Sequence, residues 1–412
     1  MVQNLKFRKS ICRSLAVVTG AALFLTTAPA ATAAALPMPM LQPSDLIGAS
    51  GVQLEAQTPK QGMELYHKFP ASSVWQTPMA SRTLDDGAVQ IWYLRVDYDA
   101  ATTYMNKLVL CLGEIRDGQW TLPAVSSTPP PWGGVNNIVM TRSPYPSSWG
   151  GFAPHQIVSG GGGLQMLYWD QPASFQDPAG GLRAISSDGK TWSKIPNTVF
   201  TDYNDNFTLR REGSVDNLYQ EVLQPWPNKP YPDNLSQYKR VISLRTSTNN
   251  LATWTPANPA NPTLAPDAND PIETEFYCLK TFAYGSGYGG VLWKYYADPT
   301  RPNEHSRIFK YELVVSDDGV SWQRPYRDTE LGFFSYVDPF ELDGNMWFAT
   351  QGAPGTSIEG STLLKGWTQD RLVAAVGNGN FRTQSFARPD GLVALNAKVF
   401  HAPQMLAHAV AG

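Results

Sequence analysis

A turn motif that ends in tryptophan recurs along the chain and constrains the fold more than any other feature. The full form, Ser-x-Asp-Gly-x-x-Trp, occurs at 186–192 and at 316–322. An Asn-Asn form occupies 247–254, and shorter forms stand at 116–120 and 364–367. An Asp-Gly pair supplies the positive-φ positions of a tight hairpin turn, in which Ser and Asp side chains bond backbone groups. The motif predicts five hairpins, with equivalent tryptophans at Trp120, Trp192, Trp254, Trp322 and Trp367.

Apolar, partly alternating runs precede these hairpins and are typical of β-strands. Four runs lie directly before a hairpin, at 107–114, 181–185, 240–245 and 309–315. Four more lie farther upstream, at 89–94, 164–169, 290–296 and 345–349. Each repeat is therefore predicted to be an antiparallel sheet of about four strands. Five such sheets around an axis form a five-bladed β-propeller, an all-β fold.

The composition agrees with a large all-β domain and excludes several other classes. Charged residues make up 16% of the 412 residues, against about 25% in an average globular chain. Aromatic residues make up 12%, and the 34 glycines and 33 prolines imply frequent turns. This composition excludes a coiled coil and a disordered chain. The formal net charge of −3, with no basic run beyond the N-terminus, argues against nucleic-acid binding.

The N-terminal residues have the three-part pattern of a secretory signal peptide. Basic residues stand within 1–13, an apolar stretch follows to about residue 28, and small residues occupy 31–33. A membrane anchor is the alternative, but the apolar stretch is short for a span. We expect a cleavable signal peptide that directs the protein outside the cell or to the periplasm, and no membrane span elsewhere. The expected divisions are a signal peptide (1–35), an extended segment (36–60), the propeller (61–400) and a tail (401–412).

The cysteines and histidines indicate no metal centre. Cys111 and Cys278 lie in apolar, strand-like runs. They could pair in an oxidising compartment, but two buried, unpaired thiols are the favoured reading. The five histidines are scattered and match no zinc spacing. The sequence indicates no cofactor, and it leaves open a calcium ion at the axis.

Longer stretches resemble a known group of proteins. The hairpin motif resembles the Asp box of sialidases, in which the Asp and Trp serve the turn and its packing. The segments 134–140, 264–277 and 386–396, taken in order, resemble the secreted five-bladed β-propellers of the glycoside hydrolase superfamily. That superfamily includes arabinanases, levansucrases and invertases. The resemblance implies glycan hydrolysis without naming a sugar. The invertase signature is absent, since Asn269-Asp270-Pro271 lacks the following Asn-Gly.

Glycoside hydrolysis usually needs two carboxyl groups. The innermost strand of each propeller blade borders the axis, so catalytic acids are expected where a blade begins. Asp205, Glu275 and Asp338 fit that position. We predict that Glu275 is the proton donor and that Asp205 and Asp338 are base and stabiliser, all facing one axial cavity. A structural role in loop hydrogen bonding is the alternative for each acid.

Four further residues are candidates for binding the sugar. Arg183 and Arg240 could bind carboxylated sugars, and Trp226 and Tyr277 could stack on sugar rings. The predicted function is a secreted, monomeric glycoside hydrolase for a poly- or oligosaccharide, with furanosides among the candidates. The alternative is a non-catalytic propeller that binds a carbohydrate or a protein. A sialidase is less favoured, because it needs three arginines around one carboxylate and a Tyr–Glu pair.

Overall fold

The computed structural model describes most of the predicted propeller. The described residues are 46–68, 74–97, 108–130, 132–142, 152–160, 162–170, 180–201, 206–231, 233, 235, 237–285, 287–297, 309–352, 360–369 and 371–383. Every helix or strand within these ranges is a β-strand. The predicted signal peptide, the C-terminal tail and Asp205 lie outside them.

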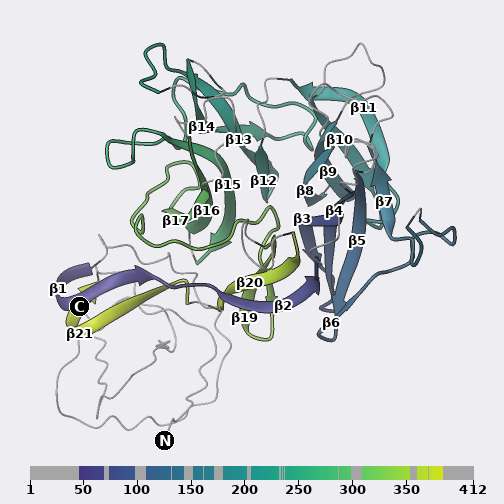
Figure 1. Cartoon of the computed structure of the whole chain (residues 1–412), viewed down its shortest axis with the longest axis horizontal. Coiled ribbons are helices and arrows are strands. Elements are labelled where there is room, and N and C mark those ends of the chain that lie inside the picture. Colours follow the sequence, from purple (N-terminus) through teal and green to yellow (C-terminus); the bar gives the residue numbers. More distant parts are fainter. Residues whose placement is uncertain are drawn as a thin grey trace, which may run out of the picture.

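Five antiparallel sheets surround a common axis (Figure 1), which confirms the all-β, five-bladed β-propeller. Blade 1 contains β3 (Val74–Thr83), β4 (Val89–Asp97), β5 (Val109–Arg116) and β6 (Gln119–Thr121), and β7 (Ile138–Thr141) pairs with β5. Blade 2 contains β8 (Ala153–Gly160), β9 (Gly163–Asp170), β10 (Gly180–Ser186) and β11 (Ser193–Phe200). Blade 3 contains β12 (Phe207–Glu212), β13 (Val215–Pro225) and β14 (Tyr238–Ser247). Blade 4 contains β15 (Thr274–Tyr284), β16 (Gly287–Tyr296) and β17 (Phe309–Ser316).

Blade 5 joins the two ends of the propeller. It contains β18 (Phe340–Leu342), β19 (Asn345–Gln351) and β20 (Thr362–Thr368), and its outer strand is β2 (Lys60–Tyr66) from the N-terminal side of the chain. A separate two-stranded sheet pairs β1 (Leu46–Ala56) with β21 (Val373–Thr383). In Figure 1 this purple and yellow ribbon projects from the ring to the left of blade 5. The segment predicted to be extended therefore contains a paired strand.

Four of the five predicted hairpins form. Their turns contain positive-φ residues, namely Asp117 and Gly118, Gly189, Asn250 and Leu251, and Gly319. The fifth prediction is wrong, because Trp367 lies on β20 itself, where it pairs with Met346. In blade 5, β2 pairs with β20 and occupies the place that the returning strand of a hairpin takes elsewhere.

Among the described residues the apolar core consists of five large clusters, each between two neighbouring blades, and a smaller sixth cluster around Tyr231, Tyr295 and Ala297. Trp92 and Leu112 of blade 1 pack with Met166 and Leu182 of blade 2, for example. The other four large clusters occupy the remaining junctions around the ring. A blade buries both faces in this way, which explains why its central strands are continuously apolar.

Two smaller observations complete the fold. Cys111 and Cys278 are both buried and no disulfide joins them, as the favoured reading predicted. No helix in the part of the chain that the structure describes is long and apolar enough to cross a membrane.

Candidate functional site

The inner strands of the blades run in the same direction along the axis. Near the starts of β8 and β12, the ring of His155 lies 4.1 Å from the ring of Phe207. Near their ends, Arg211 donates a hydrogen bond of 2.7 Å to the carbonyl oxygen of Ser159. The axis therefore has an N-terminal mouth, where the inner strands begin, and a C-terminal mouth, where they end.

A belt of polar side chains crosses the middle of the axis and joins the blades. Lys280 of β15 is fully buried, and its ammonium lies 2.5 Å from Asp338 and 3.2 Å from the Gln156 side-chain oxygen. Ser81 donates to the backbone oxygen of Asp338 at 2.8 Å. Thr208 donates to the backbone oxygen of Leu279 at 2.5 Å. Asp338 is thus one half of an ion pair in this belt, with a side chain that is 39% exposed.

Glu275 lies at the N-terminal mouth, as the second residue of β15, and is fully buried. Its two carboxylate oxygens accept hydrogen bonds of 2.7 Å from Lys229 and from Arg240. A carboxylate that is removed from water in this way needs such partners, since an unpaired buried charge is very costly. Glu275 is therefore held as an anion between two cations.

Arg240 connects two buried acids. Its guanidinium contacts Glu275 and also lies 2.8 Å from Glu221, which is fully buried. Burial by itself lowers the pKa of Arg240, but the charges of Glu221 and Glu275 raise that pKa above its usual range. The ring of Tyr295 lies 4.7 Å from the guanidinium. Arg240 is therefore committed to a network inside the protein.

Lys229 extends this network into the loop between β13 and β14. Its ammonium lies 2.5 Å from Asp233 and donates to the backbone oxygen of Tyr238 at 2.7 Å. Tyr231 of the same loop donates to Glu275 at 3.4 Å. Three acids and two cations are therefore gathered at the N-terminal mouth, and we call them the Glu275 network: Glu221, Lys229, Asp233, Arg240 and Glu275.

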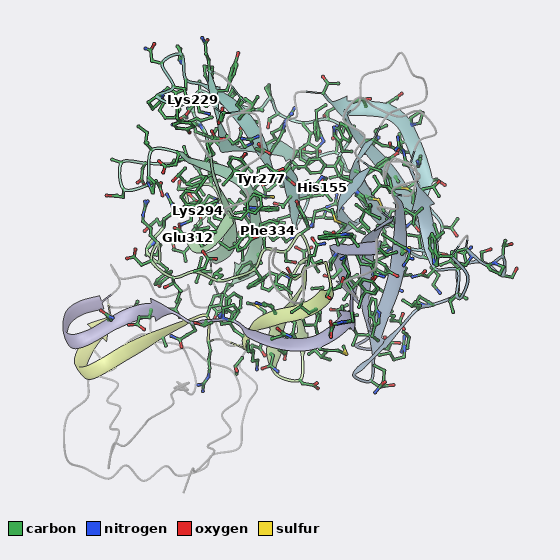
Figure 2. The ribbon with its side chains drawn as sticks, viewed as in Figure 1. His155, Lys229, Tyr277, Lys294, Glu312 and Phe334 are labelled. Carbon is green, nitrogen blue, oxygen red and sulfur yellow. The ribbon has the colours of Figure 1, made fainter. Side chains whose placement is uncertain are left out.

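The structure brings three of the four predicted sugar-binding residues to this network. Arg240 belongs to it. The half-buried ring of Tyr277 lies 5.7 Å from the Arg240 guanidinium, and the half-buried Trp226 packs edge-on against Tyr231 at 5.9 Å. Lys229 and Tyr277 are both labelled in Figure 2.

Arg183 lies elsewhere. It stands on β10, the third strand of blade 2, and donates a hydrogen bond of 2.9 Å to the backbone oxygen of Asn250 in the hairpin of blade 3. Burial lowers its pKa. Its observed partner is thus a backbone oxygen of the next blade.

Glu275 and Asp338 lie at different levels of the axis. Lys280, the partner of Asp338, follows Glu275 on the same strand by five positions, or roughly 15 Å at about 3.3 Å per residue. The carboxyl pair of a glycosidase is separated by about 5–9.5 Å. A pocket that Asp338 lines does not include Glu275. Asp205, the third predicted acid, lies outside the described residues, directly before Asn206.

Other polar residues at the N-terminal mouth were not predicted from the sequence. Tyr336 donates a hydrogen bond of 2.5 Å to the side-chain oxygen of Asn206, and its ring lies 5.4 Å from that of His155. Burial lowers the pKa of His155 to about 3. His155 is labelled near the centre of the ring in Figure 2. Each of these residues stands at the start of an inner strand, which is the signal that also selected Glu275.

Among the described residues, no group of three His, Cys, Asp or Glu side chains is arranged to hold a metal ion. The acids of the Glu275 network are instead bound by Arg240 and Lys229.

The chain is similar in structure to several solved proteins. No protein-family model matches it, and no curated protein matches its sequence. A solved RGII complex of BT0996 has a TM-score of 0.50 and 12% identity, over 85% of this chain and 96% of that one. A structure named Glycoside hydrolase has a TM-score of 0.49 and 12% identity, over 81% and 96%. The α-L-arabinanase of Penicillium chrysogenum, complexed with arabinobiose, has a TM-score of 0.42 and 9% identity, over 76% and 98%.

At these sequence identities the likeness concerns the fold alone. It rests on the BT0996 complex, which has the TM-score of 0.50. Two of the three solved structures that the chain resembles are named as a glycoside hydrolase and an α-L-arabinanase. The likeness of its hairpins to Asp boxes stays a resemblance of sequence.

Proposed function

We propose that this protein is an exported glycoside hydrolase that acts on a poly- or oligosaccharide at the N-terminal mouth of its axis. The Glu275 network is the observation that carries this proposal. Burying five ionisable side chains adds little stability compared with apolar packing. Clusters of buried charges are common where a protein performs chemistry. The resemblance of the segments 134–140, 264–277 and 386–396 to glycoside hydrolase propellers selects the reaction class.

The contacts of Glu275 argue against the role of proton donor that its position in the sequence suggested. A proton donor must hold a proton that it can release, whereas Glu275 faces Lys229 and Arg240 as an anion. We therefore assign it the part of the charged carboxylate, which stabilises the positive charge that develops on the sugar ring. Arg240 and Lys229 are positioning residues that hold it. Asp205, next to Asn206 in the sequence, is the acid we propose for the second carboxyl.

The first test is a screen of the purified mature protein against plant and microbial polysaccharides, with released reducing ends as the readout. On any substrate found, Glu275→Gln is compared with Glu312→Gln. Glu312 of β17 is a matched control, because it is also fully buried and ion-paired with one lysine and one arginine, Lys294 and Arg324. Lys294 and Glu312 lie close together in Figure 2.

The two variants should separate activity from stability. Both lose a buried charge, so both should melt earlier than the wild type. Glu275→Gln should also lower turnover by about 100-fold or more at a temperature where both are folded. Equal turnover in the two variants would show that Glu275 acts only on stability.

A non-catalytic glycan-binding propeller is the second candidate. It is favoured by the pairing of both described candidate acids, Glu275 with Arg240 and Lys229, and Asp338 with Lys280. This candidate predicts that a polysaccharide retains the protein on a column while no reducing ends appear after long incubation. Release of reducing ends that Glu275→Gln abolishes would reject it.

A further inference from the structure

A second polar site lies at the other end of the axis, outside the Glu275 network. A pocket of about 350 Å³ opens among the last residues of the inner strands. Arg82 of β3, Arg210 and Arg211 of β12, and Asp338 line it, and Ile157 and Val158 of β8 give it an apolar wall. Pockets of about 300–1,000 Å³ are typical of small-molecule sites. This pocket has the volume for about one sugar unit.

Two of the charged groups in the pocket are already paired inside the protein. Arg211 binds both oxygens of the buried Asp216, at 2.6 and 2.8 Å. Asp338 binds Lys280. These two pairs leave Arg82 and Arg210 as the cations that determine the charge of the pocket.

Arg82 and Arg210 keep unused hydrogen-bonding capacity. The Nε–H of each is buried, with no hydrogen-bond partner among the described residues. Arg82 donates to the side-chain oxygen of Gln90 at 2.6 Å, and within the described ranges it forms no ion pair. Burial lowers its pKa, and the charges of Asp188 and Asp85 act in the opposite direction. An anion in the pocket would pair with the charge of these two guanidinium groups.

Arg210 is 8% exposed and fixed in place. It donates to the hydroxyl of Tyr219 at 3.2 Å, and its guanidinium lies 3.8 Å from the ring of Tyr288. The nearest described acid is Glu212, at 3.4 Å with a side chain that is 50% exposed. The Arg210 guanidinium is thus held in one orientation by aromatic side chains, while the carboxylate of Glu212 lies toward solvent.

We propose that this pocket binds the carboxylate of a single acidic sugar, with Arg82 and Arg210 as the two cationic partners. Guanidinium groups bind carboxylates with paired, charge-assisted hydrogen bonds. The choice of a sugar as carrier of the carboxylate rests on the proposed function. The anion site itself rests only on the pocket.

The experiment is titration calorimetry of the purified protein with sodium glucuronate, glucose and sodium sulfate. Glucuronate should bind at least ten-fold more tightly than glucose, which has the same ring without the charge. Its affinity should fall as sodium chloride is raised, because salt screens the charge. Arg82→Gln should weaken glucuronate binding at least ten-fold. Arg327→Gln is the control, since this arginine pairs with Asp267 away from the pocket.

The outcomes that overturn the inference are distinct. Absence of glucuronate binding to the wild type, or unchanged binding to a folded Arg82→Gln variant, rejects the pocket as an anion site. Sulfate that binds as tightly as glucuronate rejects the sugar and leaves a site for simple oxyanions. Glu275→Gln should bind glucuronate as the wild type does. The proposed hydrolysis can therefore fail while this site stands, and the reverse holds too.

Discussion

The phenolic hydroxyl of Tyr219 donates a hydrogen bond of 2.7 Å to the backbone oxygen of Gly319, which lies 100 residues further along the chain. Tyr219 stands on β13 of blade 3, and Gly319 lies in the hairpin turn of blade 4. Trp92 of blade 1 makes the same contact with Gly189 of blade 2, at 2.9 Å. Arg183 does so with Asn250. The recurring hairpin turn is therefore also the acceptor through which one blade holds the next.

Removing the Tyr219 hydroxyl should loosen the junction between blades 3 and 4. Tyr219→Phe keeps the ring but leaves the buried Gly319 carbonyl and the Arg210 guanidinium short of a partner. We expect a loss of about 1–3 kcal/mol in the free energy of unfolding, measured by urea denaturation. Tyr238→Phe is the control, because Tyr238 is 43% exposed and should change stability by less than about 0.5 kcal/mol.

A side chain at Gly319 should cost more than its backbone angle alone explains. Gly319 has a φ of +72°, and an added Cβ would lie 2.4 Å from the Arg210 guanidinium. Gly213 has a φ of +58° and no atom within 4 Å of an added Cβ. Gly213→Ala should cost about 1–2 kcal/mol for the left-handed backbone. Gly319→Ala should melt at a clearly lower temperature, and equal melting temperatures would contradict the close contact.

His155 should make the protein less stable as the pH falls. Its pKa is about 3 in the folded protein, against an ordinary 6.5. Between these values the unfolded chain binds more protons, so the stability present above about pH 6.5 is lost as the pH approaches 3. The slope from this residue is at most about 1.4 kcal/mol per pH unit. His155→Phe keeps an aromatic ring against Phe207 and should flatten the pH dependence of urea denaturation between pH 6.5 and 4. An unchanged slope would show that other groups cause it.

The Lys280–Asp338 pair should behave as a unit. Asp338→Asn leaves the buried ammonium of Lys280 without its anion, which costs about 3–5 kcal/mol for a fully buried pair and less here, because Asp338 is partly exposed. Adding Lys280→Met to this variant removes the unpaired ammonium charge. The double variant should be more stable than Asp338→Asn alone in thermal denaturation. A double variant that is less stable would mean that the two residues act independently.

Local patterns were sufficient to predict most of the fold. The run 164–169 lies within β9 and the run 309–315 within β17, because strands buried on both faces of a blade must be apolar throughout. The turn chemistry of Ser186 and Asp188 is equally local. The hydroxyl of Ser186 accepts from the Gly189 amide at 2.8 Å, and Asp188 accepts from the Lys190 and Thr191 amides.

Long-range pairings could not be predicted. The residues around Trp367 match a short form of the hairpin motif. Their strand nevertheless pairs with β2, which lies near the other end of the chain. The sequence alone indicated that Glu275 stands at the start of a blade strand. Its partner Lys229 stands in a Pro-rich loop, whose return to β15 depends on the tertiary fold. The sequence therefore indicated the place of the acid on its strand without showing that it is ion-paired.

Because β2 closes the ring, it is synthesised long before the strand with which it pairs. Lys60 of β2 contacts Thr368 at the end of β20, 308 residues later. At about 5–20 residues per second, a ribosome needs roughly 15–60 seconds to make the intervening chain. Throughout that interval β2 has no partner, and an unpaired strand edge is prone to associate with other chains. We therefore expect β2 to be a point of association between newly made chains until the last blade has emerged.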